Sequence, residues 1–332
     1  MVSPKITISD IAEDVGVSVS TVSRVLNGSG LVSRPQRDRI LESAARLGYR
    51  KQQRRRQAGR TIVTIALVLP ESTPGPLHLF YDTGELVDSV HAAFGRTRVN
   101  VVVVSVARWR DTFEQKKMGD VDGCILAFTD PDRHLSEHLE EHGIPTVSLN
   151  RIRPDGNYVS CDNRNGMSAL VRQLVSVRGA DHDIVYLDYN AIPAVSGERR
   201  DGFLDAVGEL GIQRSRCHVY EIHHLSQIND RFFRDLSENS VRSVVCFNDV
   251  VAVYVYQAAL HRGMRIPEDL SLTGFDNSPV RQLLDRAIDT VDLGVGTLAR
   301  TAADWLRSCV IQAECRPLQV VLEPRYLPGD TL

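Results

Sequence analysis

Three polar side chains share one face of a predicted helix near the N-terminus: Ser20, Arg24 and Asn27. At 100° per residue they lie opposite the apolar Val22 and Val25. Hydroxyl, guanidinium and amide groups hydrogen-bond to the base edges and phosphates of duplex DNA. This face therefore indicates binding of double-stranded DNA, provided that neighbouring elements present the helix to a groove.

Two short helices joined by a tight turn would position this face. Thr7, with Asp10 three residues later, predicts a capping box, and Gly16 suits the end of the first helix. Ser18 is predicted to cap the second helix. The inner face of the first helix is formed by Ile8, Ile11, Ala12 and Val15. An amphipathic helix directly behind another is typical of a helix-turn-helix that enters the major groove.

A third helix is predicted to begin after Ser33, which would cap it, with Pro35 in its first turn. Three helices over about 50 residues can enclose a small core of their own. The alternative interpretation is that these helices are merely part of a helical bundle.

Charge is distributed unevenly along the 332 residues. Residues 1–60 hold 12 Lys and Arg against 5 Asp and Glu, a balance of +7, whereas the whole chain carries −3, which leaves −10 for residues 61–332. A basic N-terminal part on an acidic body indicates binding to a polyanion. The basic run at residues 50–60 can alternatively be a solvated linker, but beside a helix-turn-helix it favours phosphate contact.

Residues 62–332 alternate β-type apolar runs with helical patterns, and are enough for two further domains. Strands are predicted at residues 62–69, 99–106, 123–128, 146–149, 184–187, 218–222, 244–247, 270–274 and 318–322. Helices are predicted at residues 86–94, 165–177, 197–210, 250–263 and 295–311. Runs such as NVVVVSV indicate strands covered on both faces, and hence doubly wound parallel sheets of an α/β fold.

Other function classes find little support in the sequence. There is no Walker loop, no GxSxG elbow, no GxGxxG after the first strand and no metal-ligand spacing, so neither an enzyme nor a cofactor or metal is predicted. His138 and His142 stand four apart on a Glu-rich surface helix, a weak metal candidate. No signal peptide or membrane span is evident, so we expect a cytoplasmic protein whose six cysteines are reduced and mostly buried.

Five segments together resemble the LacI family of bacterial transcription regulators: VSVSTVSRVLN, LGYR, SGERRDGF, CFNDVVAV and IPEDLSLTGFDNSP. The resemblance spans nearly the whole chain in the same order. It implies a helix-turn-helix headpiece (residues 1–50), a hinge (51–61) and a body (62–332) like periplasmic sugar-binding proteins. The body would have an N-subdomain (about 62–160 and 292–320) and a C-subdomain (about 162–290 and the C-terminal strand). The family implies a homodimer on a pseudo-palindromic operator, with a small-molecule effector between the subdomains.

The resemblance also assigns roles in the headpiece and the hinge. Base reading falls to Val19, Ser20 and Arg24, of which arginine can bind guanine with two hydrogen bonds. Phosphate contacts fall to Thr7, Ser18, Thr21, Ser23, Asn27 and Ser33. In the hinge, Arg55 and Ala58 stand where relatives place an alanine and a leucine that wedges into the minor groove. An alanine methyl is a poor wedge, so we expect electrostatic docking with a smaller bend.

In the body, Arg199 opens an R-x-x-G-F pattern at an expected helix N-terminal region and matches the family's effector-binding arginine. Asp249 follows a parallel strand, where such sheets bind ligands, although it can alternatively be the N-cap of the next helix. Asn248, Asp276 and Phe80 are further candidates, while His223 and His224 are interpreted as surface residues.

The loop before Phe80 departs from the family pattern, so the effector can be a modified sugar, a disaccharide or another polar metabolite, or control by a ligand can be lost. The sequence thus predicts an effector-controlled repressor. The alternatives are a solute-binding protein, or an α/β enzyme with a fused DNA-binding headpiece.

Overall fold

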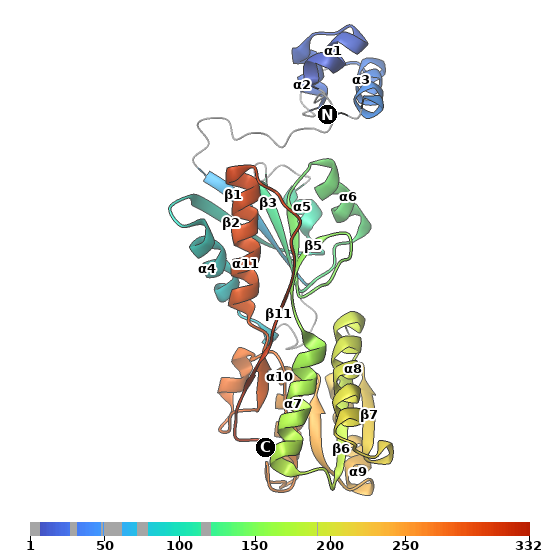
Figure 1. Cartoon of the computed structure of the whole chain (residues 1–332), viewed down its shortest axis with the longest axis vertical. Coiled ribbons are helices and arrows are strands. Elements are labelled where there is room, and N and C mark those ends of the chain that lie inside the picture. The colour runs from blue at the N-terminus through green and yellow to red at the C-terminus, as the bar shows by residue number, and fades with distance from the viewer. Residues whose placement is uncertain are drawn as a thin grey trace. The chain divides into compact units, whose positions relative to one another are not determined.

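Two compact units divide the chain between Gly59 and Arg60 in the computed structural model (Figure 1). The structure describes residues 7–26, 32–47, 49, 62–71, 79–113, 121–190 and 192–332. The hinge positions Arg55 and Ala58, together with Asn27, lie outside these residues. The first unit is helical, and the second contains the sheets.

The N-terminal unit consists of α1 (Ile8–Val15), α2 (Val19–Leu26) and α3 (Arg34–Arg46). The predicted capping box is present, since Thr7 and Asp10 bond reciprocally, and Gly16 ends α1 with φ 73°. Ile11, Val22 and Ile40, one from each helix, are fully buried in a common core. Apolar spacing therefore predicted both the helices and the faces on which they pack.

Ser33 precedes α3 as predicted, but its side chain makes no capping hydrogen bond, so its predicted capping role was wrong. Pro35 near the start of the helix already removes one N–H that would need a cap. The position of the helix start was correct, whereas the interaction assigned to it was not.

The two caps should therefore differ in their effect on stability. Thr7→Ala is expected to lower the local stability of the headpiece by about 1 kcal/mol, because it leaves the N–H of Asp10 without its side-chain acceptor. Ser33→Ala, the matched control, is expected to change it by less than about 0.5 kcal/mol. Amide hydrogen exchange in the intact protein measures both, and equal losses would contradict the assignment.

The first sheet of the body has six parallel strands in the order β11-β5-β4-β3-β1-β2. Its strands are β1 (Ile62–Leu69), β2 (Arg98–Ser105), β3 (Gly123–Ala127), β4 (Thr146–Leu149), β5 (Asn157–Cys161) and β11 (Gln319–Leu322). One face packs on α4 (Thr83–Phe94) and α11 (Val295–Arg307), the other on α5 (Trp109–Phe113) and α6 (Arg133–Glu141). This is the N-subdomain.

The run NVVVVSV does not form a central strand. It belongs to β2, which is the edge of the sheet, and Val103 there is 46% exposed. By contrast, β3 in the middle of the sheet is buried along its whole length. The expectation of cover on both faces was therefore wrong for this run, because β-branched residues favour any strand and do not report its place in the sheet.

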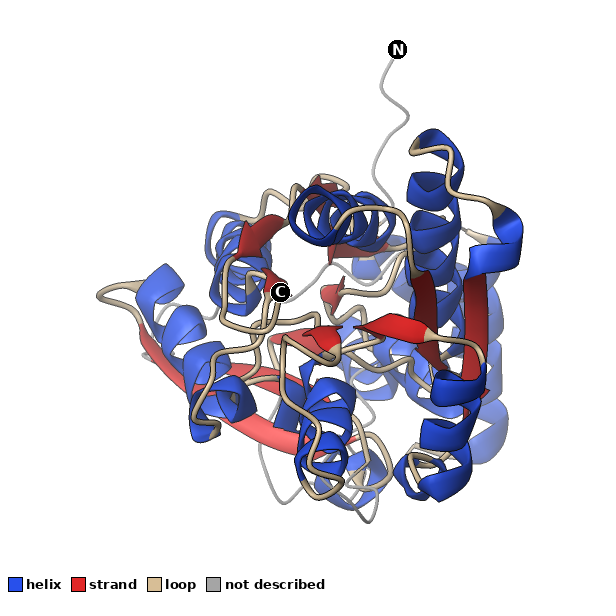
Figure 2. Cartoon of the chain, turned by 90° about the horizontal axis from the view of Figure 1, so that it is seen from below, coloured by secondary structure: helices blue, strands red, loops and turns tan. Residues whose placement is uncertain are grey.

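The C-subdomain holds a second parallel sheet in the order β7-β6-β8-β9. Its strands are β6 (Asp183–Tyr189), β7 (Cys217–Ile222), β8 (Val241–Cys246) and β9 (Ser271–Thr273). Helices α7 (Asn163–Arg178) and α8 (Pro193–Glu209) pack on one face, and α9 (Asp230–Glu238) and α10 (Asp249–Leu260) on the other. Figure 2 shows helices on either side of the strands, the arrangement expected of a doubly wound α/β fold.

The glycine of the R-x-x-G-F pattern has a packing role. A Cβ atom on Gly202 would lie 2.1 Å from the carbonyl oxygen of Arg164, so only glycine permits this approach of α8 to α7. Phe203, the next residue, is fully buried in the core beneath both helices. Two of the three residues of this pattern thus serve packing, and the third, Arg199, reaches the cleft.

Between residues 121 and 332 the chain passes from one subdomain to the other three times, after β5, after β10 (Thr290–Asp292) and after β11 (Figure 1). The strand β12 (Arg325–Leu327) follows β11 and pairs antiparallel with β10. Strands β5, β10 and β12 were not predicted, and β10 and β12 are only three residues each. Among the residues that the structure describes, no helix is both long enough and apolar enough to cross a membrane.

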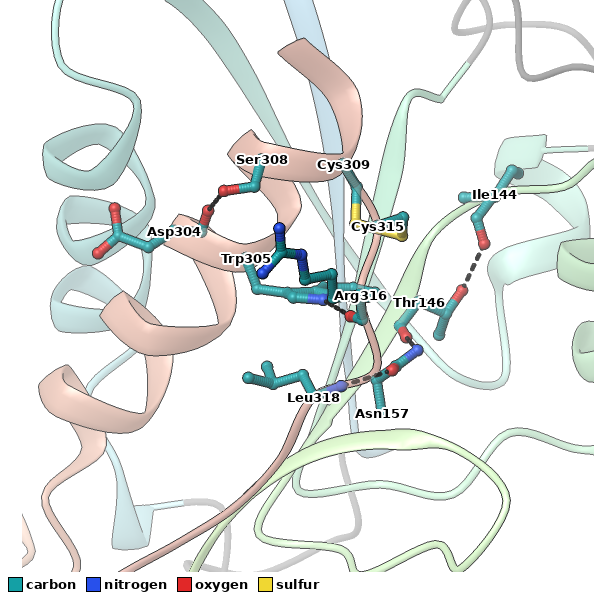
Figure 3. Close-up of a disulfide and its surroundings, with 10 residues drawn as sticks. All are labelled: Ile144, Thr146, Asn157, Asp304, Trp305, Ser308, Cys309, Cys315, Arg316 and Leu318. Carbon is teal, nitrogen blue, oxygen red and sulfur yellow. Dashed lines mark hydrogen bonds between the residues drawn. A yellow bond between two sulfur atoms is a disulfide. The ribbon is translucent and has the colours of Figure 1, made fainter. Parts of the chain in front are cut away.

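The cysteines differ from expectation at one pair. Cys124, Cys161, Cys217 and Cys246 are free and buried, but Cys309 and Cys315 form a disulfide (Figure 3), so the prediction of reduced thiols was wrong for these two. After α11 the chain forms a π-helical turn, η5 (Ser308–Gln312), and Ala313 adopts φ 56°. This reversal brings the two Cα atoms to 4.3 Å from each other, although the cysteines are six positions apart in sequence.

Candidate functional site

Helix α2 packs an apolar face on the headpiece core. Val22 and Val25 are buried, whereas Val19 is 42% exposed. The Oγ atom of Ser18 accepts the N–H of Thr21 at 3.2 Å, and the two hydroxyls lie 2.8 Å apart. Ser18 is therefore a cap, as predicted. Helix α2 also contains Ser20, Ser23 and Arg24, whose side chains lie outside the described residues.

A small pocket lies where the two subdomains of the body meet. It is lined by Phe80, Asn150, Arg151, Ile192, Val195, Arg199, Phe247, Asn248 and Asp276. Its cavity volume of about 20 Å³ has room for about one water molecule. A sugar-sized ligand therefore requires the walls of this pocket to move apart.

Arg199 is the central polar group of this pocket. It is the seventh residue of α8, beyond the N-terminal turn where it was expected, and its side chain is 2% exposed. Its guanidinium donates to Asp276 Oδ1 at 2.7 Å, to the carbonyl of Phe247 at 2.8 Å and to Asn163 Oδ1 at 3.0 Å. It also lies 3.9 Å from the centroid of the Phe275 ring.

Asp276 and Asn248 complete the C-subdomain side. Asp276 adopts φ 106°, a left-handed conformation that turns the chain just after β9. Burial raises the pKa of its carboxyl, while the facing Arg199 and a hydrogen bond from Asn248 oppose that rise. Asn248 caps α10 by accepting the N–H of Val251 at 3.0 Å, and it also lines the pocket.

Asp249 differs from both interpretations of the sequence. The N-cap of α10 is Asn248, so Asp249 is not the cap, and it is not among the residues that line the pocket. Its fully buried carboxylate accepts the hydroxyl of Thr290 and the N–H of Ser278, each at 2.6 Å. Burial raises its pKa to about 8. Asp249 therefore holds the segments after β9 against α10, one residue away from the ligand side.

Phe80 lies on the N-subdomain side of the pocket and packs against two other rings. Its centroid lies 4.7 Å from that of Tyr81 and 5.1 Å from that of Phe128, both edge-on. The hydroxyl of Ser278 in the C-subdomain donates to the carbonyl of Leu79, which joins the two walls. The predicted effector residues Phe80, Arg199, Asn248 and Asp276 thus meet at one place.

Several lining residues were missed by the sequence analysis. Asn150 and Arg151 directly follow β4, and the carboxyl ends of parallel strands are where α/β sheets bind ligands. The same rule that pointed to Asp249 would have found them. Ile192, Val195 and Phe247 carry no comparable signal, because apolar residues are common in every element.

The histidine candidates lie elsewhere. His223 and His224 are exposed, as expected, and contact no residue of the pocket lining in the interactions described. The rings of His138 and His142 on α6 lie 4.2 Å apart. Among residues the structure describes, no group of three His, Cys, Asp or Glu is placed to hold a metal ion.

Comparisons with known proteins identify the family. The model for bacterial regulatory proteins of the lacI family matches residues 7–52, and that for the periplasmic binding protein-like domain matches residues 178–332. An uncharacterized HTH-type transcriptional regulator in the aml 5' region of Streptomyces limosus is 30% identical over 335 residues, covering 96% of this chain and 92% of the relative. The chain therefore belongs to the LacI family of transcriptional regulators.

Solved structures show the same fold. A LacI family regulator from Enterococcus faecium with bound ribose has a TM-score of 0.67 at 19% identity, covering 81% of this chain and 98% of that one. A lac repressor dimer bound to operator and an anti-inducer has a TM-score of 0.62 at 20% identity, covering 99% of both chains. The similarity to the lac repressor spans the headpiece as well as the body.

Proposed function

We propose that this protein is a transcriptional repressor that binds a pseudo-palindromic operator as a homodimer, with its affinity set by a sugar-like effector in the pocket between the subdomains. The observation that carries the proposal is the pocket itself, because its walls come from both subdomains and its polar groups converge from α8, α10 and the segments after β4 and β9. A ligand there favours one relative orientation of the subdomains. The relatives whose printed names include operator and ribose support both halves of this proposal.

The headpiece residues have separate roles in the proposal. Val19, Ser20 and Arg24 on α2 read bases, while Thr7, Ser18, Thr21, Ser23, Asn27 and Ser33 bind phosphates, and Arg55 and Ala58 lie in the minor groove. The exposed Val19 and the inward Val22 and Val25 support this orientation of α2. In a dimer, two such helices must face successive turns of the major groove, so a change in their spacing weakens binding.

Arg24→Ala tests sequence reading. An operator is first selected from random duplexes with the intact protein, and binding is then measured on that operator and on unrelated DNA. Arg24→Ala is expected to weaken operator binding by about 1–3 kcal/mol more than binding to unrelated DNA. Arg37→Ala, which removes an exposed cation from α3, is the control and should leave the preference unchanged. Equal losses on both duplexes for Arg24→Ala would show that it contacts phosphate only.

A further inference from the structure

The disulfide between Cys309 and Cys315 closes the turn between α11 and β11 (Figure 3). Its two cysteines differ in their access to solvent. Cys309 is 3% exposed and packs in the core with Trp305, whereas Cys315 is exposed. The four other cysteines of the chain are free and buried. A dissolved thiol therefore reaches the disulfide through Cys315.

The disulfide joins elements that belong to two of the three crossings between the subdomains. Helix α11 follows β10, after which the chain enters the N-subdomain, and β11 leads into the segment that returns to the C-subdomain. Cys309 lies just after α11, and Cys315 lies four residues before β11 begins. The pair therefore ties the N-subdomain parts of both crossings to each other.

The strand β11 has few other attachments. It has four residues, lies at the edge of the sheet next to β5, and is exposed or half-buried along its length. The turn before it is also held by hydrogen bonds, from the indole Nε1 of Trp305 to the carbonyl of Arg316 at 2.7 Å and from the N–H of Leu318 to Asn157 Oδ1 at 3.0 Å. Short exposed edge segments open at low free-energy cost, so a covalent link beside β11 contributes to its order.

Thiol–disulfide exchange at this pair has a defined direction of attack. A small thiolate attacks the exposed Sγ of Cys315, the S–S bond breaks, and its electron pair passes to the Sγ of Cys309, which takes up a proton. A second small thiolate attacks the non-protein sulfur of the mixed disulfide and releases Cys315, which is protonated in turn. The protein disulfide has then gained two electrons, and two small thiols have become one small disulfide. Oxidation follows the same steps in reverse.

We propose that Cys309 and Cys315 form a reversible redox site that responds to small thiols and disulfides and alters operator binding. Cys315 is the sulfur that exchanges, and Cys309 is the resolving cysteine. Reduction frees β11 and the crossing that follows it, which widens the range of orientations that the subdomains adopt. Apparent operator affinity falls with the fraction of molecules in the competent orientation. This regulatory step rests on the proposed function, whereas the exchange chemistry does not.

The exchange chemistry is tested on the full-length protein with glutathione and glutathione disulfide as probes, followed by alkylation and peptide mass spectrometry. The Cys309–Cys315 pair is expected to open and close reversibly, while the four buried cysteines stay free of glutathione. Cys309→Ala should acquire glutathione on Cys315 at least about 10-fold faster than Cys315→Ala acquires it on Cys309, because access limits the rate. Equal rates, or a pair that does not cycle between the two states, would overturn the proposal.

Two measurements follow the consequence of reduction. Hydrogen exchange of residues 318–322 should become about 3-fold or more faster in the reduced protein. Binding to an operator selected with the oxidised protein should become about 3-fold or more weaker. Cys315→Ala, which removes an exposed sulfur, should match the reduced wild type in both measurements and ignore glutathione. Cys217→Ala removes a free cysteine of the C-subdomain and is the control, which should respond as the wild type does.

The outcomes separate this inference from the proposed function. Equal operator affinities of the oxidised and reduced forms overturn the inference and leave the repressor intact. Unchanged hydrogen exchange of residues 318–322 overturns it too, as does an effect of glutathione that persists in Cys315→Ala. If neither form prefers any duplex, the proposed function fails and the regulatory step fails with it.

Discussion

The free energy of unfolding of the wild type is expected to fall, relative to that of Asp249→Asn, as pH rises from about 5 to about 8. Burial raises the pKa of Asp249 from its ordinary 3.8 to about 8. Between these values the folded protein holds a proton that the unfolded chain has released, so raising the pH favours unfolding. The largest slope from one such group is about 1.4 kcal/mol per pH unit, and the contribution levels off above pH 8.

Urea unfolding at pH 5, 6, 7 and 8 measures this difference. An asparagine can still accept the N–H of Ser278 and donate to the hydroxyl of Thr290, so the stabilities of the two proteins should differ least at pH 5. At pH 8 the variant should be the more stable by several kcal/mol. Asp181→Asn, at a fully exposed carboxylate, is the control and should parallel the wild type. A parallel curve for Asp249→Asn would show that Asp249 is ionised in the folded protein.

The orientation of Asp249 could not be predicted from the sequence. The pattern correctly placed a polar pair, Asn248 and Asp249, where the chain passes from β8 into α10. Which of two adjacent residues faces the pocket depends on the backbone torsion at the helix start, since successive side chains of a helix differ by 100°. Asn248 caps the helix and faces the pocket, and Asp249 turns to Thr290 from a distant part of the chain. Charge and spacing alone carry no information about that partner.

The headpiece and the order of strands and helices were largely predictable, because hydrophobic period and capping residues act locally. Features that depend on long-range placement were not. The run NVVVVSV lies in the edge strand β2, and a chain reversal that no sequence motif predicts brings Cys309 and Cys315 together. Arg151 belongs to the same class, because its burial and its hydrogen bond to the carbonyl of Phe128 exist only once β4 and the Phe128 segment are side by side. Which charged residues line this pocket is therefore determined by the assembled fold.

Arg199→Met is expected to lower the free energy of unfolding of the body by about 3–5 kcal/mol. The substitution removes three hydrogen bonds that join α8 to α7, to the end of β8 and to the segment after β9. It also leaves Asp276 buried without its cation, which is why the cost exceeds that of the lost hydrogen bonds alone. Methionine retains much of the aliphatic volume, so the loss reports mainly on the charge pair.

A double-mutant cycle with Asp276→Asn tests this explanation. Asp276→Asn alone should also destabilise, because Arg199 then lacks its counter-charge, but the double variant should lose clearly less than the sum of the two single losses. Urea unfolding monitored by far-UV circular dichroism gives all four free energies at one pH. Additive losses would mean that Arg199 acts chiefly through the carbonyl of Phe247 and the Phe275 ring. In that case Asp276 would be an independently buried acid, and the pocket would already contain a negative charge available to a neutral, polyhydroxylated ligand.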